Sequence, residues 1–379
     1  MVSRNIQKRP NGRYRARYRD PSGKEHARHF ARKADAQAWL DEVTAAIVTG
    51  QYVAPKNGRI TFGDYFESWA ARQIWAPGTA RAMRLAVEST PFTGVPLADL
   101  RRSHIESWVK AMLTKDRGEG KAPGLAPGTV RTRFNNVRAV LRAAVRDRMI
   151  VSDPSEGVTL PRGRRAEVAM RLPTAAEVRA LIEAAEAPYR AFFALAAFAG
   201  LRLGEAAGLR VSDIDFLGRS LRVARQVQRE RGGGVEIRAP KYGSERTVYI
   251  ADGLAQILAR HIERHRPGDD PDRWLFLGEG DDPPHQNTIT YQWRKAQAAA
   301  GVSGVKLHDL RHFYASGLIA AGCDVVTVQR ALGHAKATTT LNTYAHLWPS
   351  AEDRTRKAAA GLLAEVFGDA ADSMRTAEG

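Results

Sequence analysis

Cysteine is almost missing from this sequence of 379 residues, which contains only Cys323. A single cysteine excludes an internal disulfide and any metal site built from several cysteines, and it suits a reducing compartment. Long apolar runs are missing too: the longest, Ala191–Leu201, is about half of the ~20 residues that a membrane span requires. The first residues lack the apolar stretch of a signal peptide. We therefore expect a soluble, cytoplasmic protein.

Acidic residues are outnumbered. The 41 Asp and Glu residues stand against 58 Lys and Arg, which gives a net charge of +17 and a pI near 10.3. Such an excess favours a polyanionic partner, because basic side chains that neutralise phosphates release condensed counterions. Ribosomal proteins and proteins with basic solvated surfaces share this composition, so charge alone does not distinguish them. The length allows two or three domains, each with its own core.

Residues 1–57 are predicted to form a small domain rich in basic residues. The apolar pattern and the turn signals predict three short strands and a helix, at 6–8, 13–19, 25–30 and 33–48. Strict alternation puts four arginines on one face of the second strand: Arg13, Arg15, Arg17 and Arg19. We predict that this arginine comb binds DNA, and a solvated edge strand is the alternative.

The next region, 58–157, has a helical pattern. Apolar residues recur at helical spacing in four segments: 62–72, 79–88, 102–113 and 129–147. Linkers containing proline and glycine flank the region, at 51–58 and 153–165. The last helix also carries a stripe of arginines: Arg131, Arg138, Arg142 and Arg146. We predict a helical domain in which this stripe contacts DNA, with a solvated stripe as the alternative.

The remaining sequence predicts a larger domain over 158–367 and a polar, disordered tail at 368–379. Thr174-Ala175-Ala176-Glu177 is a capping box that begins a helix. Helices then alternate with a small β region, with strands near 220–226, 235–239 and 246–250. The expected fold class is mainly α with small β-sheets (α+β): a three-stranded sheet plus helix, a helical domain and a mixed, mostly helical domain.

Four separated segments of the largest domain carry residues suited to chemistry. Gly200–Glu205 lies at a turn between apolar helices and contains Arg202. Pro240–Arg246 is expected to form a tight hairpin with Lys241 at its tip. His308 and Arg311 lie three residues apart at the start of a helix, so both side chains project to one side. Leu332-Gly333-His334 is followed ten residues later by Tyr344.

In these segments the sequence closely resembles the tyrosine recombinases of the phage-integrase type. The resemblance covers 172–348, with the motifs in order and at matching spacing; Tyr242 departs from it, because threonine commonly follows the lysine. It implies a site-specific recombinase that breaks and rejoins DNA through a covalent phosphotyrosine at Tyr344, to integrate or excise a phage or mobile element. The regions 1–57 and 58–157 are similar to the arm-binding and core-binding domains of an integrase.

The residue types fit that chemistry. In-line attack by an oxygen nucleophile builds negative charge on the non-bridging phosphate oxygens, and Arg202 and Arg311 can each hold such oxygens in a fork. Lys241 can protonate the 5′ oxygen as it leaves. Tyrosine has an ordinary pKa of about 10 and needs a cationic pocket or a base to lose its proton. No nucleotide or metal cofactor is expected, since the phosphotyrosine conserves the bond energy.

The resemblance also implies further roles and partners. His334 adds a hydrogen bond to the phosphate, His308 assists as acid, base or orienting group, and Glu205 orients the arginines and His308. The helical and catalytic domains would grip opposite faces of double-stranded DNA at a core site, and the N-terminal domain would bind an arm site. Protomers would form a tetramer on DNA, with a helix near 352–367 packed on a neighbour. Accessory DNA-bending or excision factors and a bacterial host complete this expectation.

Each residue also has an ordinary interpretation. Arg202 could be a surface ion pair with Glu205, His334 a helix cap and Tyr344 a half-buried aromatic residue, although four segments in order argue against that combination. A metal site would draw on His308, His312, Cys323 and His334, of which the two residues at chelating spacing are His308 and His312. A type IB topoisomerase, a catalytically inactive DNA-binding regulator and an RNA- or ribosome-associated protein remain as alternative functions.

Overall fold

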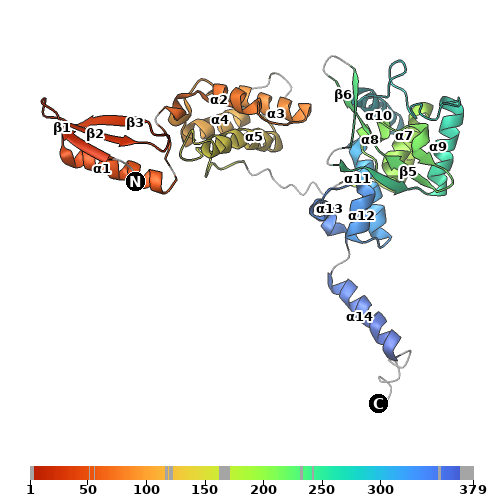
Figure 1. Cartoon of the computed structure of the whole chain (residues 1–379). Helices are drawn as coiled ribbons and strands as arrows, with labels where there is room; N and C mark the ends of the chain where they lie inside the picture. The colour runs from red at the N-terminus through yellow and green to blue at the C-terminus, as the bar shows by residue number, and fades with distance from the viewer. Residues whose placement is uncertain are drawn as a thin grey trace. The chain divides into compact units, whose positions relative to one another are not determined.

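A computed structural model describes residues 4–50, 52–54, 56–115, 118, 123–161, 171–230, 234–240, 243–348 and 351–367 of the chain. The chain divides into two compact units, Met1–Glu167 and Val168–Gly379. Their helices and strands are labelled in Figure 1. None of the helices in these described ranges is both long and apolar enough to cross a membrane.

The first unit begins with an antiparallel sheet that one helix covers (Figure 1). The strands are β1 (Arg4–Lys8), β2 (Tyr14–Arg19) and β3 (Glu25–Phe30), in the order β1-β2-β3, and the helix is α1 (Lys33–Val48). Ala16 and Tyr18 of β2 are buried with Ala36 and Leu40 of α1, because alternate residues of a strand face one side. The predicted three strands and helix are confirmed.

A bundle of helices follows in the same unit. Its elements are η1 (Asn57–Arg59), α2 (Phe62–Ala70), α3 (Pro77–Glu88), η2 (Leu97–Asp99), α4 (Arg102–Thr114) and α5 (Pro127–Arg146). Helices α3 and α5 begin two residues before their predicted starts. Each has proline at its first position, where the missing N–H breaks no helical hydrogen bond. The apolar stripe of α5, including Val130, Phe134 and Val137, is buried in the core of the bundle.

The second unit is mostly helical with two small sheets. Its helices are α6 (Ala175–Ala184), α7 (Ala187–Phe198), α8 (Leu203–Ala207), η3 (Val211–Asp213), α9 (Asp252–His265), α10 (Gln286–Ala300), α11 (Leu307–Ala320), α12 (Val325–Leu332), α13 (Ala337–Tyr344), η5 (Ala345–Leu347) and α14 (Ala351–Phe367). Its strands are β4 (Ile214–Asp215), β5 (Ser220–Val223), β6 (Gln226–Arg229), β7 (Val235–Arg238) and β8 (Arg246–Tyr249). The predicted fold class is confirmed.

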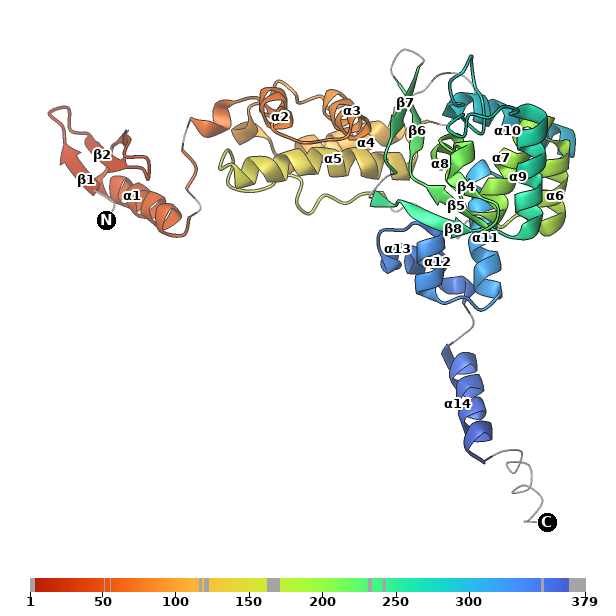
Figure 2. The ribbon, with the colours of Figure 1, turned by 45° about the vertical axis from the view of Figure 1, so that its right-hand side comes forward.

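Helix α7 is the centre of this unit. Residues Ala191–Ala197 are all buried, and the helix packs against α6, α9 and α11 (Figure 2). The longest apolar run of the sequence is therefore a core helix, which explains why it is apolar on every side. The predicted capping box begins α6: the Thr174 hydroxyl accepts from the Glu177 N–H, and the Glu177 carboxylate accepts from the Thr174 N–H.

The β region differs from the prediction. One ladder has the order β4-β5-β8, and a separate hairpin pairs β6 with β7. The segment Pro240–Arg246 therefore connects two different sheets, and its prediction as a tight hairpin was wrong. Pro240 has no N–H with which to extend the β7 ladder, and Gly243 turns the chain with a φ of +62°. Lys241 and Tyr242, like the tail at 368–379, lie outside the described residues.

Candidate active site

Three of the four predicted segments meet at one point of the second unit. They are the α7–α8 turn, the start of α11, and the end of α12 with α13. The Arg202 guanidinium donates to the Gly333 carbonyl (Nη2–O 3.2 Å). The Arg311 guanidinium donates to the carbonyls of Gly200 and Leu332. Residues more than 100 positions apart in the sequence are thus tied together by arginine side chains.

Gly200 allows this turn to approach α11. Its φ of +63° lies in the left-handed region, and a Cβ there would overlap the ring of Tyr314. Because the turn sits directly on α11, the Gly200 carbonyl reaches Arg311 while Arg202 follows two residues later. The glycine therefore brings the two predicted phosphate-binding arginines together.

Arg311 is a buried cation, with only 2% of its surface exposed. Burial, together with the charge of Arg202, lowers the pKa of Arg311 to about 9. This value still lies above neutral pH, and the guanidinium therefore stays charged. Two backbone carbonyls hold two of its nitrogens, which offsets part of the desolvation penalty. An anion arriving beside it would offset more.

Glu205 is a buried carboxylate that fixes two arginines. It is 1% exposed and accepts from Arg202 (Oε1–Nη1 2.6 Å) and from Arg246 (Oε2–Nη2 2.9 Å). Burial raises the pKa of Glu205, but the hydrogen bond and charge of Arg246 and the charge of Arg202 outweigh it and hold that pKa below its ordinary value. The carboxylate therefore stays ionised and holds the Arg202 fork in place. The sequence suggested His308 and both motif arginines as its partners, whereas the hydrogen bonds go to Arg202 and Arg246.

Arg246 is a site residue that the sequence did not predict. Its side chain is 8% exposed, and besides Glu205 it donates to the Ala331 carbonyl (Nε–O 3.0 Å), so it joins β8 to the end of α12. Alternation along the strand offered a signal, because Arg246 shares its face with the buried Val248 and Ile250. A charged residue in the inward register of a strand requires a buried partner.

The two predicted histidines lie in strongly positive surroundings. The residue His308 as a whole is exposed, but part of its ring is buried. This burial lowers the pKa of His308 to about 4, and electrostatic interaction with His312, Arg311 and Arg202 adds to the effect. Burial, followed by Arg311 and Arg202, lowers the pKa of His334 to about 4 as well. The neutral rings can gain protons more readily once a phosphate anion offsets the arginine charges.

A buried threonine orients His334. The Thr340 hydroxyl, on α13, hydrogen-bonds with Nδ1 of His334 (2.9 Å) and is completely buried. Fixing one ring nitrogen defines the direction of the other, so Nε2 is the atom of His334 that can donate to a substrate. No motif in the sequence marked Thr340.

Tyr344 ends α13 inside a small core. It is 1% exposed and packs with Ala315 and Ile319 of α11 and with Val328 and Leu332 of α12. Its hydroxyl hydrogen-bonds with Nδ1 of His312 (2.7 Å). Burial raises the pKa of Tyr344, although the charges of Arg311 and Arg202 lower it in part.

Comparison with known proteins assigns the family. The sequence profile of the phage integrase family matches residues 171–350, and that of the phage integrase N-terminal domain matches residues 5–49. The chain belongs to the phage integrase family of tyrosine recombinases. Its enzyme class is therefore that of a tyrosine-type site-specific recombinase.

Relatives of this recombinase resemble it along most of their length. The putative prophage phiRv2 integrase of Mycobacterium tuberculosis is 28% identical over 93% of this chain and 92% of the relative. The integrase of Mycobacterium phage L5 is 25% identical over 86% of this chain and 88% of the relative. Among solved structures, the Tn1549 transposon integrase bound to transposon right end DNA has a TM-score of 0.66, with 20% identity over 80% of this chain and all of the other. A lambda integrase tetramer bound to a Holliday junction has a TM-score of 0.54, with 20% identity over 88% of this chain and 96% of the other. These two solved structures share the fold of this chain.

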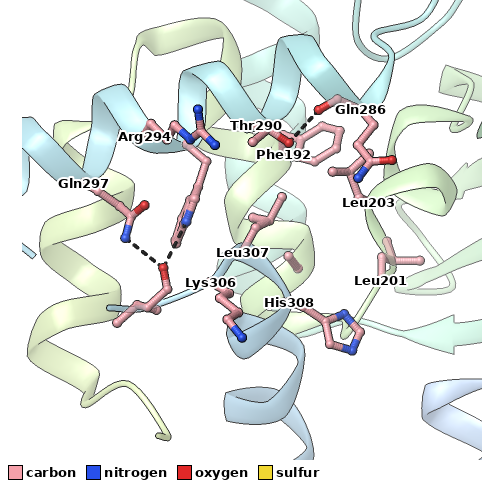
Figure 3. A pocket seen from close by; sticks show the side chains of 13 residues that line it. Phe192, Leu201, Leu203, Gln286, Thr290, Arg294, Gln297, Lys306, Leu307 and His308 are labelled. Carbon is pink, nitrogen blue, oxygen red and sulfur yellow. Dashed lines mark hydrogen bonds between the residues drawn. The ribbon is translucent and has the colours of Figure 1, made fainter. Parts of the chain in front are cut away.

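The start of α11 in the recombinase is anchored beside a pocket (Figure 3). The Val305 carbonyl accepts from Trp293 (Nε1, 3.2 Å) and Gln297 (Nε2, 2.7 Å) of α10, and the Asp309 carboxylate accepts from the Lys306 N–H (2.7 Å). These bonds fix the helix that carries His308 and Arg311. The pocket, of about 450 Å³, is largely apolar and has His308 at one end.

The remaining predicted segment, Pro240–Arg246, borders the site. Lys241 itself lies outside the described residues, but Gly243–Thr247 line a cavity of about 350 Å³ whose opposite side is formed by Gln329, Arg330 and Gly333–Ala335. His334 thus faces the segment that carries the lysine. Within the described residues, no group of three or more His, Cys, Asp or Glu side chains is arranged to hold a metal ion.

The arginine comb lies on the sheet face opposite α1. Arg15 and Arg17 each approach the Glu25 carboxylate (3.8 and 3.9 Å). This single negative charge can offset only one of the two positive charges, and the interaction is weak because it lies at the surface. Arg13 comes before the strand and is exposed, as is Arg19 at its end. The comb remains strongly basic, and its contact with DNA remains a prediction.

The arginine stripe of α5 is partly occupied by an internal partner. Arg138 and Arg142 both approach the same Asp153 oxygen (Nε–Oδ2 3.6 and 3.7 Å), whose carboxylate also accepts from the Ser155 N–H (2.8 Å). This contact fastens the segment after the bundle to α5. Arg131 is exposed. The stripe therefore has a structural role in addition to any contact with DNA.

Proposed function

We propose that this recombinase cleaves and rejoins duplex DNA through a covalent 3′-phosphotyrosine at Tyr344, and that it integrates or excises a phage or other mobile element. One observation carries the proposal: Arg202 and Arg311 are fixed by hydrogen bonds at the same point, and both act electrostatically on the buried Tyr344. Two guanidiniums that are held by hydrogen bonds and whose charges act on one phenol suit a phosphodiester with charge developing on its oxygens.

In the proposed reaction the Tyr344 oxygen attacks phosphorus and forms the phosphotyrosine bond while the bond to the 5′ oxygen breaks. Arg202, Arg311 and His334 donate to the non-bridging oxygens, and their fixed positions avoid reorganisation as the charge develops. Lys241 gives a proton to the departing 5′ oxygen. A 5′ hydroxyl of another strand then attacks the same phosphorus and releases Tyr344. His308, at the edge of the site, assists proton movement.

DNA and further copies of the chain are the proposed partners. The net charge of +17 and the basic comb favour double-stranded DNA, with core and arm sites bound by different domains. The structural similarity to integrases solved on DNA, one of them a tetramer, supports a tetramer assembled on DNA. Helix α14 carries four exposed apolar residues suited to packing on a neighbour: Leu362, Leu363, Val366 and Phe367. Accessory DNA-bending or excision factors belong to the same proposal.

A suicide substrate tests this function. A nicked duplex that carries the attachment core flanking the gene should trap a protein–DNA adduct with the full-length chain. Tyr344→Phe should bind the duplex and form no adduct, since only the attacking oxygen is lost. An adduct formed by Tyr344→Phe would show that the nucleophile is misassigned, and an intact chain that never forms one would refute the proposal.

A further inference from the structure

His312 provides the one imidazole that touches the proposed nucleophile within the described residues. Nδ1 lies 2.7 Å from the Tyr344 hydroxyl, and the two rings meet edge to face at 5.6 Å between centroids. The ring comes from α11, one residue after Arg311, and Tyr344 comes from the end of α13. Both are held in packed helices, so the contact is built into the fold.

We propose that His312 is the general base of the cleavage step and that its Nδ1 takes the phenolic proton as the Tyr344 oxygen attacks phosphorus. This inference rests on the proposed function of Tyr344. The oxygen–phosphorus bond forms as the O–H bond breaks, and His312 becomes an imidazolium. The leaving 5′ oxygen takes its proton from a different group. In the rejoining step His312 returns the proton to the phenol, so no proton is gained or lost over a full cycle.

The protonation states fit this direction of transfer. Burial lowers the pKa of His312, with Asp309 raising it and Arg311 lowering it, so the ring is neutral at neutral pH and can accept. Burial also raises the pKa of Tyr344, so the phenol keeps its proton until the reaction removes it. A neutral base beside a protonated nucleophile is the starting arrangement that general-base catalysis requires.

The surroundings of His312 are mixed in charge. His308, Asp309 and Arg311 face it from its own helix, with the His308 ring edge to face at 4.9 Å, and Tyr344 faces it from α13. The Asp309 carboxylate favours the imidazolium that forms, whereas Arg311 disfavours it until the phosphate is bound. The contact geometry distinguishes His312 from His308, because the phenol bonds with His312.

The test measures adduct formation by the full-length chain on the nicked core duplex. His312→Asn and His312→Gln can hydrogen-bond to the phenol but cannot accept its proton, and two replacements allow for one that does not fold. Both variants should bind the duplex normally and cleave roughly 10²-fold slower or worse. Their rates should keep rising with pH toward the tyrosine pKa, while the wild-type rate levels off at lower pH. His346→Ala changes an exposed histidine two residues beyond Tyr344 and should behave as wild type.

A second substrate separates the two proton transfers. Replacing the bridging 5′ oxygen by sulfur removes the need for an acid. The slow cleavage by His312→Asn should persist on this substrate, because the phenol still lacks its base. Cleavage within threefold of wild type, a wild-type pH profile, or rescue by sulfur would each overturn the role of His312. Each of these outcomes leaves Tyr344 as the nucleophile, which only the Tyr344→Phe result can remove.

Discussion

Replacing Arg246 by alanine should loosen the site without removing any of the catalytic residues predicted from the sequence. The substitution removes the hydrogen bonds to Glu205 and to the Ala331 carbonyl, and it leaves a carboxylate that is 1% exposed with Arg202 as its remaining cation. Removing one partner of a buried ion pair costs about 3–5 kcal/mol, and we expect the lower end because Arg202 remains. Local opening of β8 and α12 should then become roughly 10²-fold more frequent, since about 1.4 kcal/mol corresponds to a factor of ten.

Hydrogen–deuterium exchange of the full-length chain measures this opening segment by segment. Peptides from β8 and α12 should exchange faster in Arg246→Ala, while peptides from α5, in the other unit, serve as an internal reference. Arg222→Ala is the matched control, because Arg222 lies on the neighbouring strand β5 and forms an exposed ion pair with Glu245 at 4.0 Å. If Arg246→Ala and Arg222→Ala exchange alike, the buried network does not hold β8 to α12 and the argument fails.

The remaining predictions concern single parts of the mechanism. Lys241→Ala should cleave ordinary DNA slowly and recover on the substrate with a 5′ bridging sulfur; equal defects on both would remove Lys241 as the acid. Arg202→Ala should bind core DNA but form adduct roughly 10²-fold more slowly, the usual effect of losing one transition-state donor. Because the pKa of Glu205 is lowered on folding, its stabilisation is present above about pH 4.5 and is lost as the pH falls through the folded-state value. Thermal unfolding between about pH 5 and pH 3 should therefore shift less in Glu205→Gln than in the wild type. Deleting 1–57 should preserve the adduct on an isolated core site and abolish binding to an arm site, as footprinting would reveal.

Periodicity was enough to predict most elements of this recombinase. The alternation in β2 and the repeat of apolar residues in α5 depend on local spacing, which the sequence displays directly. The errors lie in the β region, where residues that are distant in the sequence decide which strands pair. The sequence predicted a single strand over 220–226, yet β5 ends at Val223 and β6 begins at Gln226 in a different sheet. The chain crosses between the two ladders at Ala224 and Arg225. The division into three domains and a tail stays a prediction.

The sequence motifs predicted the main residues of the site, but not the groups that hold those residues in place. Arg202 and Arg311 stood out because they occur in ordered motifs. The groups that hold Arg311 are backbone carbonyls, which every residue has and no motif marks. Thr340 and His312 act through contacts between helices, and neither spacing nor composition reveals which polar side chain will meet a given ring.

The carboxylate shared by Arg138 and Arg142 affects how the first unit would respond to salt. If the α5 stripe meets phosphates, Asp153 stays beside the two guanidiniums, and the three groups together carry about one positive charge. The number of counterions released on binding follows the net charge delivered to the phosphates, with a slope of about 0.9 per phosphate neutralised. Such a stripe therefore weakens the salt dependence of DNA binding relative to an uncompensated one.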